Sequence, residues 1–227
     1  MSAPADPTTR VSRVDDAYER IKGEILSNRM PPGFQATEME IAASLDMSRT
    51  PVHGALLRLA QEGLITLRPR RGATVLPIVP DDMREIYEIL TVLESEAGAA
   101  LAERRLAADE LAPLADATTR MERSLSADDL DGWAVHDDRF HRALLELHGN
   151  KRLARIVNTL FDQVYRSRMI ALRMRPRPVR STQEHREVIA ALGEGDADAV
   201  RSTLRRHRKR TATELIAVLE NFRLGQL

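Results

Sequence analysis

The chain has 227 residues, 34 Lys+Arg against 34 Asp+Glu, and no cysteine. This length suits one large domain or two modest ones. The absence of cysteine excludes a disulfide-stabilised fold, a thiolate metal site and a thiol nucleophile. The zero net charge argues against nucleic-acid binding through bulk charge. Any metal must therefore be bound by histidines and carboxylates, and any nucleic acid by locally placed cations.

The sequence contains no apolar run long enough for a transmembrane helix, and its first ten residues lack the apolar stretch of a signal peptide. We therefore expect a soluble, cytoplasmic protein with no membrane attachment. Residues 1–12 combine prolines with small polar side chains and have too little apolar content to fold. We predict that they form a disordered lead-in.

Helical spacing of apolar residues begins near Asp15 and predicts a first helix that ends before Met30. A second helix begins after Thr37, because Thr37 and Glu40 have the spacing of a capping box. A third helix follows almost at once, with Ser48 as its N-cap. Its apolar stripe comprises Val52, Leu56, Leu57 and Leu59. Two short helices joined so closely should cross steeply, as in a helix-turn-helix.

Two β-prone runs, 64–67 and 73–76, surround a basic turn and predict a hairpin. We place a domain boundary after Pro77, so that 13–77 forms a winged helix-turn-helix and 78–227 an all-α bundle. Helical periodicity in the second domain covers about 81–105, 107–126, 129–148, 150–173, 180–193 and 196–222. Ser181 and Glu184 have capping-box spacing near the start of the fifth of these helices. The expected fold class is mainly α.

A helix-turn-helix followed by a basic hairpin can place one helix in the DNA major groove and the hairpin against the neighbouring backbone or minor groove. The first turn of the third helix would then face the bases, which nominates Arg49, Thr50 and His53. Among these, Arg49 can form a bidentate contact with guanine. The hairpin cations that would contact phosphates are Arg68, Arg70 and Arg71. The alternative is a purely structural domain with a solvated basic turn.

The run SRTPV at 48–52, together with the motifs at 37–42, 62–65 and 71–72, resembles the winged-helix domain of GntR-type bacterial transcription regulators. We include Thr37 and Gly72 among the candidate DNA contacts. Family members usually have arginines where this chain has Met39 and His53, and both arginines commonly contact DNA in the family. These departures predict an operator that differs from the family consensus, or weaker binding to it.

Three histidines and one aspartate on the predicted bundle helices could hold a metal. Asp137 and His141 are four residues apart and project from one helix face, and His185 and His207 lie on the two last helices. One carboxylate and three imidazoles suit zinc, nickel, manganese or iron, and can leave a coordination position for water or an effector oxygen. From spacing alone, a hydrogen-bonded surface pair at Asp137 and His141 is the alternative.

The motif at 137–141, Gly149-Asn150, Glu184-His185 and the stretch 195–207 resemble the FCD effector domain of one GntR subfamily. In many of its members the aspartate and three histidines bind a divalent metal that in turn ligates a small carboxylate effector. The resemblance implies a metal here, with zinc as our first choice. Leu90 stands where the family commonly has a cavity arginine, so the effector-binding residues stay unassigned. The effector is then less acidic, or the metal holds most of it.

We expect a homodimeric, ligand-responsive transcription regulator that reads a pseudo-palindromic operator and controls the catabolism or transport of a small organic acid. One alternative is a metal-dependent enzyme in which the four metal-ligand candidates activate water. Another is a regulator that binds its ligand without metal. The sequence contains no nucleophile elbow, phosphate-binding glycine loop or cofactor fingerprint, so we predict that the chain is not an enzyme.

Overall fold

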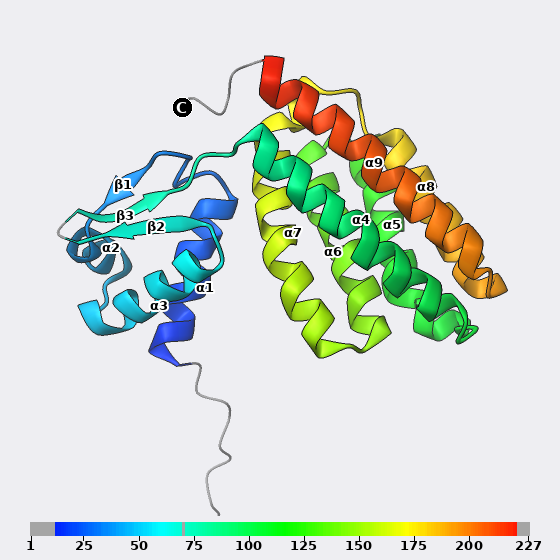
Figure 1. The fold of residues 1–227 in the computed structure, drawn as a ribbon, viewed down its shortest axis with the longest axis horizontal. Helices are drawn as coiled ribbons and strands as arrows, with labels where there is room; N and C mark the ends of the chain where they lie inside the picture. Colours follow the sequence, from blue (N-terminus) through cyan, green and yellow to red (C-terminus); the bar gives the residue numbers. More distant parts are fainter. Residues whose placement is uncertain (1–11, 70, 222–227) are drawn as a thin grey trace, which may run out of the picture. The chain divides into compact units, whose positions relative to one another are not determined.

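The computed structural model describes residues 12–69 and 71–221. It separates into two compact units that divide between Pro77 and Ile78. The first unit combines helices with a small sheet and the second is helical, so the predicted fold class is confirmed (Figure 1). Residues 1–11 of the predicted lead-in lie outside the described residues. Ser12, which we had assigned to the lead-in, is instead the N-cap of the first helix, where its side chain accepts a hydrogen bond from the backbone N–H of Asp15.

The first unit is a three-helix domain with a three-stranded sheet. In chain order its elements are α1 (Arg13–Leu26), β1 (Gln35–Ala36), α2 (Glu38–Leu45), α3 (Arg49–Gln61), β2 (Ile65–Arg68) and β3 (Gly72–Val75). The strands are antiparallel in the order β1-β3-β2. Sequence periodicity misses β1, because two residues cannot display an alternating pattern.

The structure of α2, α3 and the turn between them agrees with the sequence prediction except at Ser48 and Leu57. The capping box of Thr37 and Glu40 is present, and Asp46 adopts a left-handed conformation with φ 54°. Ser48 occupies the N-cap position of α3, but its side chain makes no capping hydrogen bond. Leu57, which we had placed in the apolar stripe, is 46% exposed. Leu57 is adjacent to Leu56 in sequence and so points to a different side of α3.

Gly72 occupies a position at the start of β3 that other residues cannot easily adopt. Its φ is +79°, and a Cβ atom built there would lie 2.2 Å from the carbonyl oxygen of Ala36. Any side chain would therefore push β1 away from β3, because non-bonded atoms cannot approach so closely. The glycine thus allows the short strand β1 to pair with the hairpin.

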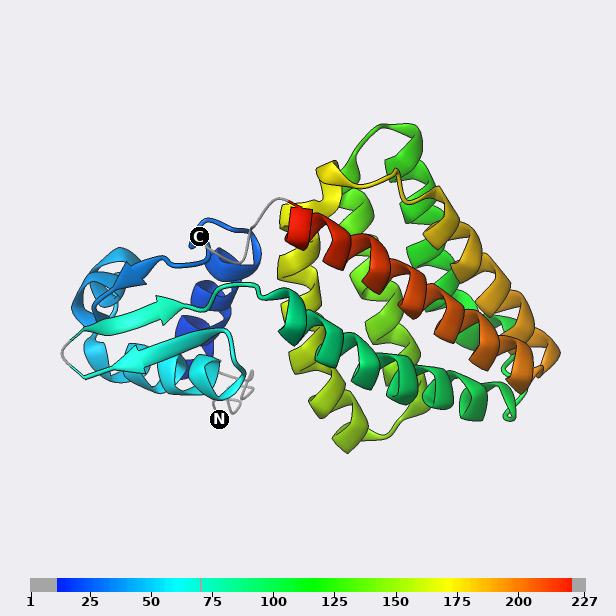
Figure 2. The same cartoon turned by 45° about the horizontal axis from the view of Figure 1, so that its top comes forward.

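The second unit is a helical bundle around one apolar core. Its elements are α4 (Pro80–Ala102), α5 (Ala108–Ser126), α6 (Leu130–His148), α7 (Lys151–Ala171), the 3-10 turn η1 (Leu172–Met174), α8 (Val179–Glu194) and α9 (Ala197–Asn221). Helices α4 and α9 lie side by side (Figures 1 and 2). Gly98 allows this close approach, since a Cβ there would lie 2.5 Å from Cδ1 of Leu204.

The start of α8 differs from the sequence prediction. Pro178 is the N-cap, with no side-chain hydrogen bond, and the helix begins at Val179. Ser181 and Glu184 therefore lie inside the helix and form no capping box; both are buried. Among the described residues, no helix is both long and apolar enough to cross a membrane.

Candidate functional site

The bundle brings together the four side chains predicted as metal ligands. Helix α6 supplies Asp137 and His141, α8 supplies His185, and α9 supplies His207. One potential ligand atom from each residue lies within 4.8 Å of those from the other three, and all four residues are buried. The three imidazole centroids are 4.9–5.3 Å apart. Residues far apart in sequence thus form one compact donor set of nitrogens and oxygens.

Two glutamates orient two of these imidazole rings. Glu94 Oε1 on α4 lies 2.5 Å from Nδ1 of His141, and Glu184 Oε2 lies 2.9 Å from Nδ1 of His207. A carboxylate that binds Nδ1–H leaves Nε2 of the same ring available to a metal. The sequence pattern assigned neither glutamate to this role. A single carboxylate inside the apolar stripe of a predicted helix was the available signal for Glu94.

His185 is held by stacking instead of hydrogen bonding. Its ring lies 4.1 Å from the ring of Phe140 at an interplanar angle of 13°. The side chain is 0% exposed, yet within the described chain neither of its ring nitrogens has a hydrogen-bond partner. Nε2 of His141 is also buried without one. Because buried polar atoms are normally paired, Nε2 of His141 and one ring nitrogen of His185 are atoms that a metal ion would satisfy.

The electrostatics place the donor set in the protonation state that metals require. Burial by itself raises the pKa of Asp137, but nearby positive charge, chiefly that of Arg168, outweighs it and holds that pKa below its usual value. Burial lowers the pKa of all three histidines. At neutral pH the cluster is therefore an ionised carboxylate with neutral imidazoles, which is the ligand form of both groups.

Three arginines lie close to this cluster. Arg168 on α7 forms an ion pair with Asp137, and Arg208 on α9 forms one with Glu94. Arg175, just after η1, acts electrostatically on the same group of charges, and within the described chain its buried Nε has no hydrogen-bond partner. Leu90 stands where the resembled family commonly has a cavity arginine. Its side chain is fully buried.

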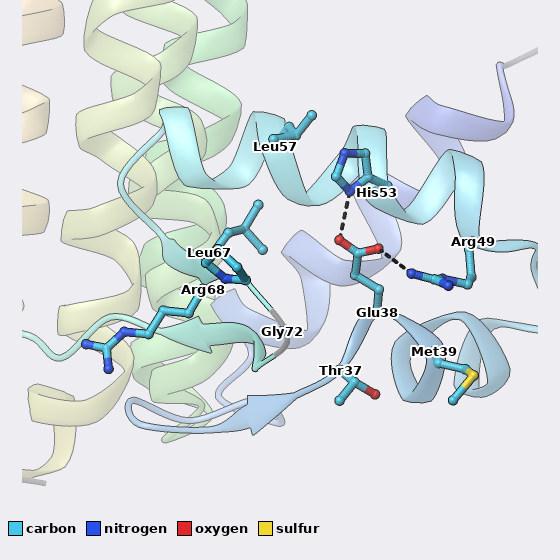
Figure 3. Close-up of a pocket in the computed structure, with 10 residues that line it drawn as sticks. Thr37, Glu38, Met39, Arg49, His53, Leu57, Leu67, Arg68 and Gly72 are labelled. Atoms are coloured by element: carbon cyan, nitrogen blue, oxygen red, sulfur yellow. Dashed lines mark hydrogen bonds and ion pairs between the residues drawn. The ribbon is translucent and has the colours of Figure 1, made fainter.

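In the first unit, most of the candidate DNA contacts line one hollow of about 480 Å³ (Figure 3). The candidates found there are Thr37, Arg49, His53, Arg68 and Gly72. Thr50 and Arg71 are exposed but do not line it. Arg70 falls outside the described residues. Met39 also lines the hollow and is 68% exposed, an unusual position for a large apolar side chain.

Glu38 on α2 connects two of the three candidate base-reading residues, and the sequence pattern did not indicate this contact. Its Oε1 lies 2.7 Å from Nδ1 of His53, and its Oε2 lies 3.4 Å from a terminal nitrogen of Arg49 (Figure 3). The hydrogen bond from His53 is the main reason that the pKa of Glu38 is lowered, against the effect of burial. The carboxylate is therefore ionised. It contacts Nδ1 of His53 and a terminal nitrogen of Arg49.

The chain is similar to known proteins in both units. The FCD domain matches residues 85–210, and the model of bacterial regulatory proteins of the gntR family matches residues 13–75. An "Uncharacterized HTH-type transcriptional regulator in the TAR-I ttuE-ttuC' intergenic region" of Agrobacterium vitis is 43% identical over 142 residues, which are 62% of this chain and 83% of that protein.

Two further similarities extend over most of the chain. The "Probable D-xylose utilization operon transcriptional repressor" of Paenarthrobacter nicotinovorans is 30% identical over 212 residues, covering 91% of this chain and 90% of the relative. The solved structure of E. coli McbR/YncC has a TM-score of 0.80 at 22% identity and covers 91% of this chain and 98% of that one, so its fold is similar.

Proposed function

Because this chain belongs to the gntR family of bacterial regulatory proteins and carries an FCD domain, we propose that this DNA-binding transcription regulator responds to a small carboxylate through a metal centre. The family sets aside the metalloenzyme alternative, since the relatives are transcription regulators and not enzymes. The metal-free regulator remains the competing proposal. The buried, unpartnered nitrogens of His141 and His185 are the observation that favours a metal.

The proposed metal ligands are Asp137, His141, His185 and His207. Their donor set fits zinc best, and nickel, manganese or iron are the other candidates, because three imidazoles and one carboxylate with no thiolate suit each of these ions. A bound divalent ion would supply positive charge and an open coordination position for an oxygen ligand. The protein's own contribution is orientation, through Glu94 and Glu184, whose carboxylates contact the Nδ1 atoms of His141 and His207.

The surrounding charges support an anionic effector. The guanidinium groups of Arg168, Arg175 and Arg208 act on the same region as the carboxylates of Asp137 and Glu94. A divalent metal would add positive charge beside these arginines. A carboxylate effector could then pair with the metal and with a guanidinium group. Arg168 and Arg175 would then provide the charge-assisted contacts that Leu90 cannot.

We further propose that α3 enters the major groove, with Arg49, Thr50 and His53 toward the bases and the cations Arg68, Arg70 and Arg71 toward phosphates. Thr37 and Gly72, which line the same hollow as Arg49 and His53, would complete the interface. The chain would act in the cytoplasm as a homodimer on a pseudo-palindromic operator that controls use of a small organic acid. Effector binding would then change operator affinity.

Two coupled titrations test this proposal. An operator is first selected from random duplex DNA with the full chain, and its affinity is then measured with zinc alone and with zinc plus mono-, di- and tricarboxylates. At least one carboxylate should change operator affinity by about 5-fold to 150-fold, the usual range of allosteric coupling. Some carboxylates will bind the protein, as shown by a rise in its thermal stability. The proposal is contradicted if neither zinc nor any of these carboxylates changes the affinity for the operator.

A further inference from the structure

His53 is the candidate base-reading residue whose hydrogen-bonding role the structure defines most closely. It lies one turn after Arg49 on α3, and its side chain is 53% exposed. Nδ1 lies 2.7 Å from Oε1 of Glu38. The other ring nitrogen, Nε2, lies on the side of the ring away from Glu38 (Figure 3). No hydrogen bond joins it to the described part of the chain, so it is available to a ligand.

The contact with Glu38 decides which ring nitrogen carries the proton. An ionised carboxylate has no hydrogen to donate, and the pKa of Glu38 is lowered chiefly by this same hydrogen bond, against the effect of burial. Nδ1 of His53 must therefore be the donor. In a neutral imidazole with Nδ1 protonated, Nε2 is an acceptor. When the His53 ring is neutral, its exposed edge thus presents a lone pair and no N–H group.

The major groove separates bases by this property. Guanine presents two acceptors there, N7 and O6, whereas adenine and cytosine each present an amino group as a donor. An arginine, which has only donors, selects guanine. We propose that His53, held by Glu38, selects a base with a major-groove amino group, adenine or cytosine, and rejects guanine. This inference rests on the proposed placement of α3 in the major groove.

The same geometry assigns different tasks to two neighbouring residues. Arg49 is 68% exposed, and its contact with Glu38 is longer, at 3.4 Å, so its guanidinium group is held less tightly than the His53 ring and can turn toward a guanine. Glu38 is a positioning residue: it acts on DNA through the His53 ring. Its side chain is 23% exposed, which keeps the carboxylate partly shielded from solvent. The half-site should therefore contain a guanine for Arg49 and a nearby adenine or cytosine for His53.

Binding-site selection from a randomised duplex library tests the inference, using the full chain, His53→Arg and Glu38→Gln. For the unchanged chain we expect one symmetric position at which adenine or cytosine exceeds guanine by at least about fivefold. His53→Arg should convert that position to guanine and leave the others unchanged. Glu38→Gln should weaken the preference there, because an amide can donate or accept and so permits either imidazole tautomer.

Arg49→Ala separates failure of this inference from failure of the major-groove placement. If the unchanged chain selects no sequence, or Arg49→Ala keeps the same preferences, the placement is wrong. If the chain selects a specific site but His53→Arg changes no position, or guanine already occupies the changed position, the role of His53 is wrong and the placement stands. Unchanged selection by Glu38→Gln would overturn the tautomer argument. His53 is exposed, so its variant should fold, and thermal melting checks this.

Discussion

Glu184 Oε2 lies 2.9 Å from Nδ1 of His207 and 2.6 Å from a terminal nitrogen of Arg210, so one carboxylate is held between a metal-ligand candidate and an arginine. Burial by itself raises the pKa of Glu184, but the hydrogen bonds from His207 and Arg210 outweigh it and lower that pKa to about 2. The carboxylate therefore stays ionised throughout the neutral range. It fixes the orientation of the His207 ring without occupying the proposed metal site.

Glu184→Gln should lower zinc affinity by about 10-fold to 100-fold, the usual cost of losing a hydrogen-bond partner of a ligating histidine. A competition titration with a fluorescent zinc chelator measures this. Glu187→Gln is the matched control, because Glu187 lies on the same helix and forms an ion pair with Arg206 at the protein surface. Equal zinc affinity in the two variants would contradict the orienting role of Glu184.

Glu94→Ala should destabilise the second unit by about 3–5 kcal/mol, because the change leaves the buried guanidinium of Arg208 without its carboxylate. Urea unfolding followed by circular dichroism measures the loss. Glu96→Ala is the control: Glu96 is two residues away but exposed, and its ion pairs with Arg201 and Arg205 lie at the surface. An equally small loss of unfolding free energy in both variants would contradict the stabilising role of the buried ion pair between Glu94 and Arg208.

Arg175→Met should weaken binding of a four-carbon dicarboxylate to the zinc-loaded protein by about 10-fold or more, while zinc affinity changes little. The reason is that Arg175 is half-buried and acts electrostatically on Asp137, but supplies no proposed metal ligand. Isothermal titration of the zinc-loaded chain measures the binding. Arg173→Met serves as the control, since Arg173 is exposed and paired with Asp131. Equal losses in the two variants would exclude Arg175 as an effector contact.

Tyr18 should make the first unit sensitive to alkali. Its hydroxyl donates to Glu62 at the end of α3, and burial is the main reason that its pKa is raised to about 12. Because the folded pKa exceeds the unfolded value of about 10, this contribution to stability is complete below pH 10 and is lost as pH rises through 12. Free energies of unfolding from pH 9 to 12 should fall less steeply for Tyr18→Phe. Parallel curves for the two proteins would show that Tyr18 does not titrate this way.

The sequence predicted those features whose signal is local or periodic. The capping box of Thr37 and Glu40 is complete within four residues, and the stripes of apolar residues define the bundle helices. The donor set could be proposed because a family resemblance connected Asp137 with histidines on other helices. Spacing alone brings only Asp137 and His141 together.

The contacts missed at the two candidate sites all depend on pairing between separate elements. Glu94 contacts His141 across 47 positions of sequence, and Glu38 contacts His53 across 15. A charged residue on a helix has no periodic signal that names its partner, so only packing reveals which ion pair it forms. For the same reason, the absence of arginine at position 90 could be seen in the sequence, whereas the nearby charge of Arg168 could not.

Metal stoichiometry tests the central claim most directly. The purified full chain is stripped with a chelator, dialysed to equilibrium against micromolar zinc, and analysed for zinc per chain, alongside His185→Gln. His185 is the informative residue, because both of its ring nitrogens are buried without hydrogen-bond partners in the described chain. The account predicts about one zinc ion per unchanged chain and a large loss in the variant, by analogy with other sites built from imidazoles. Zinc content near zero in the unchanged chain, or equal content in both proteins, would contradict a metal-centred regulator.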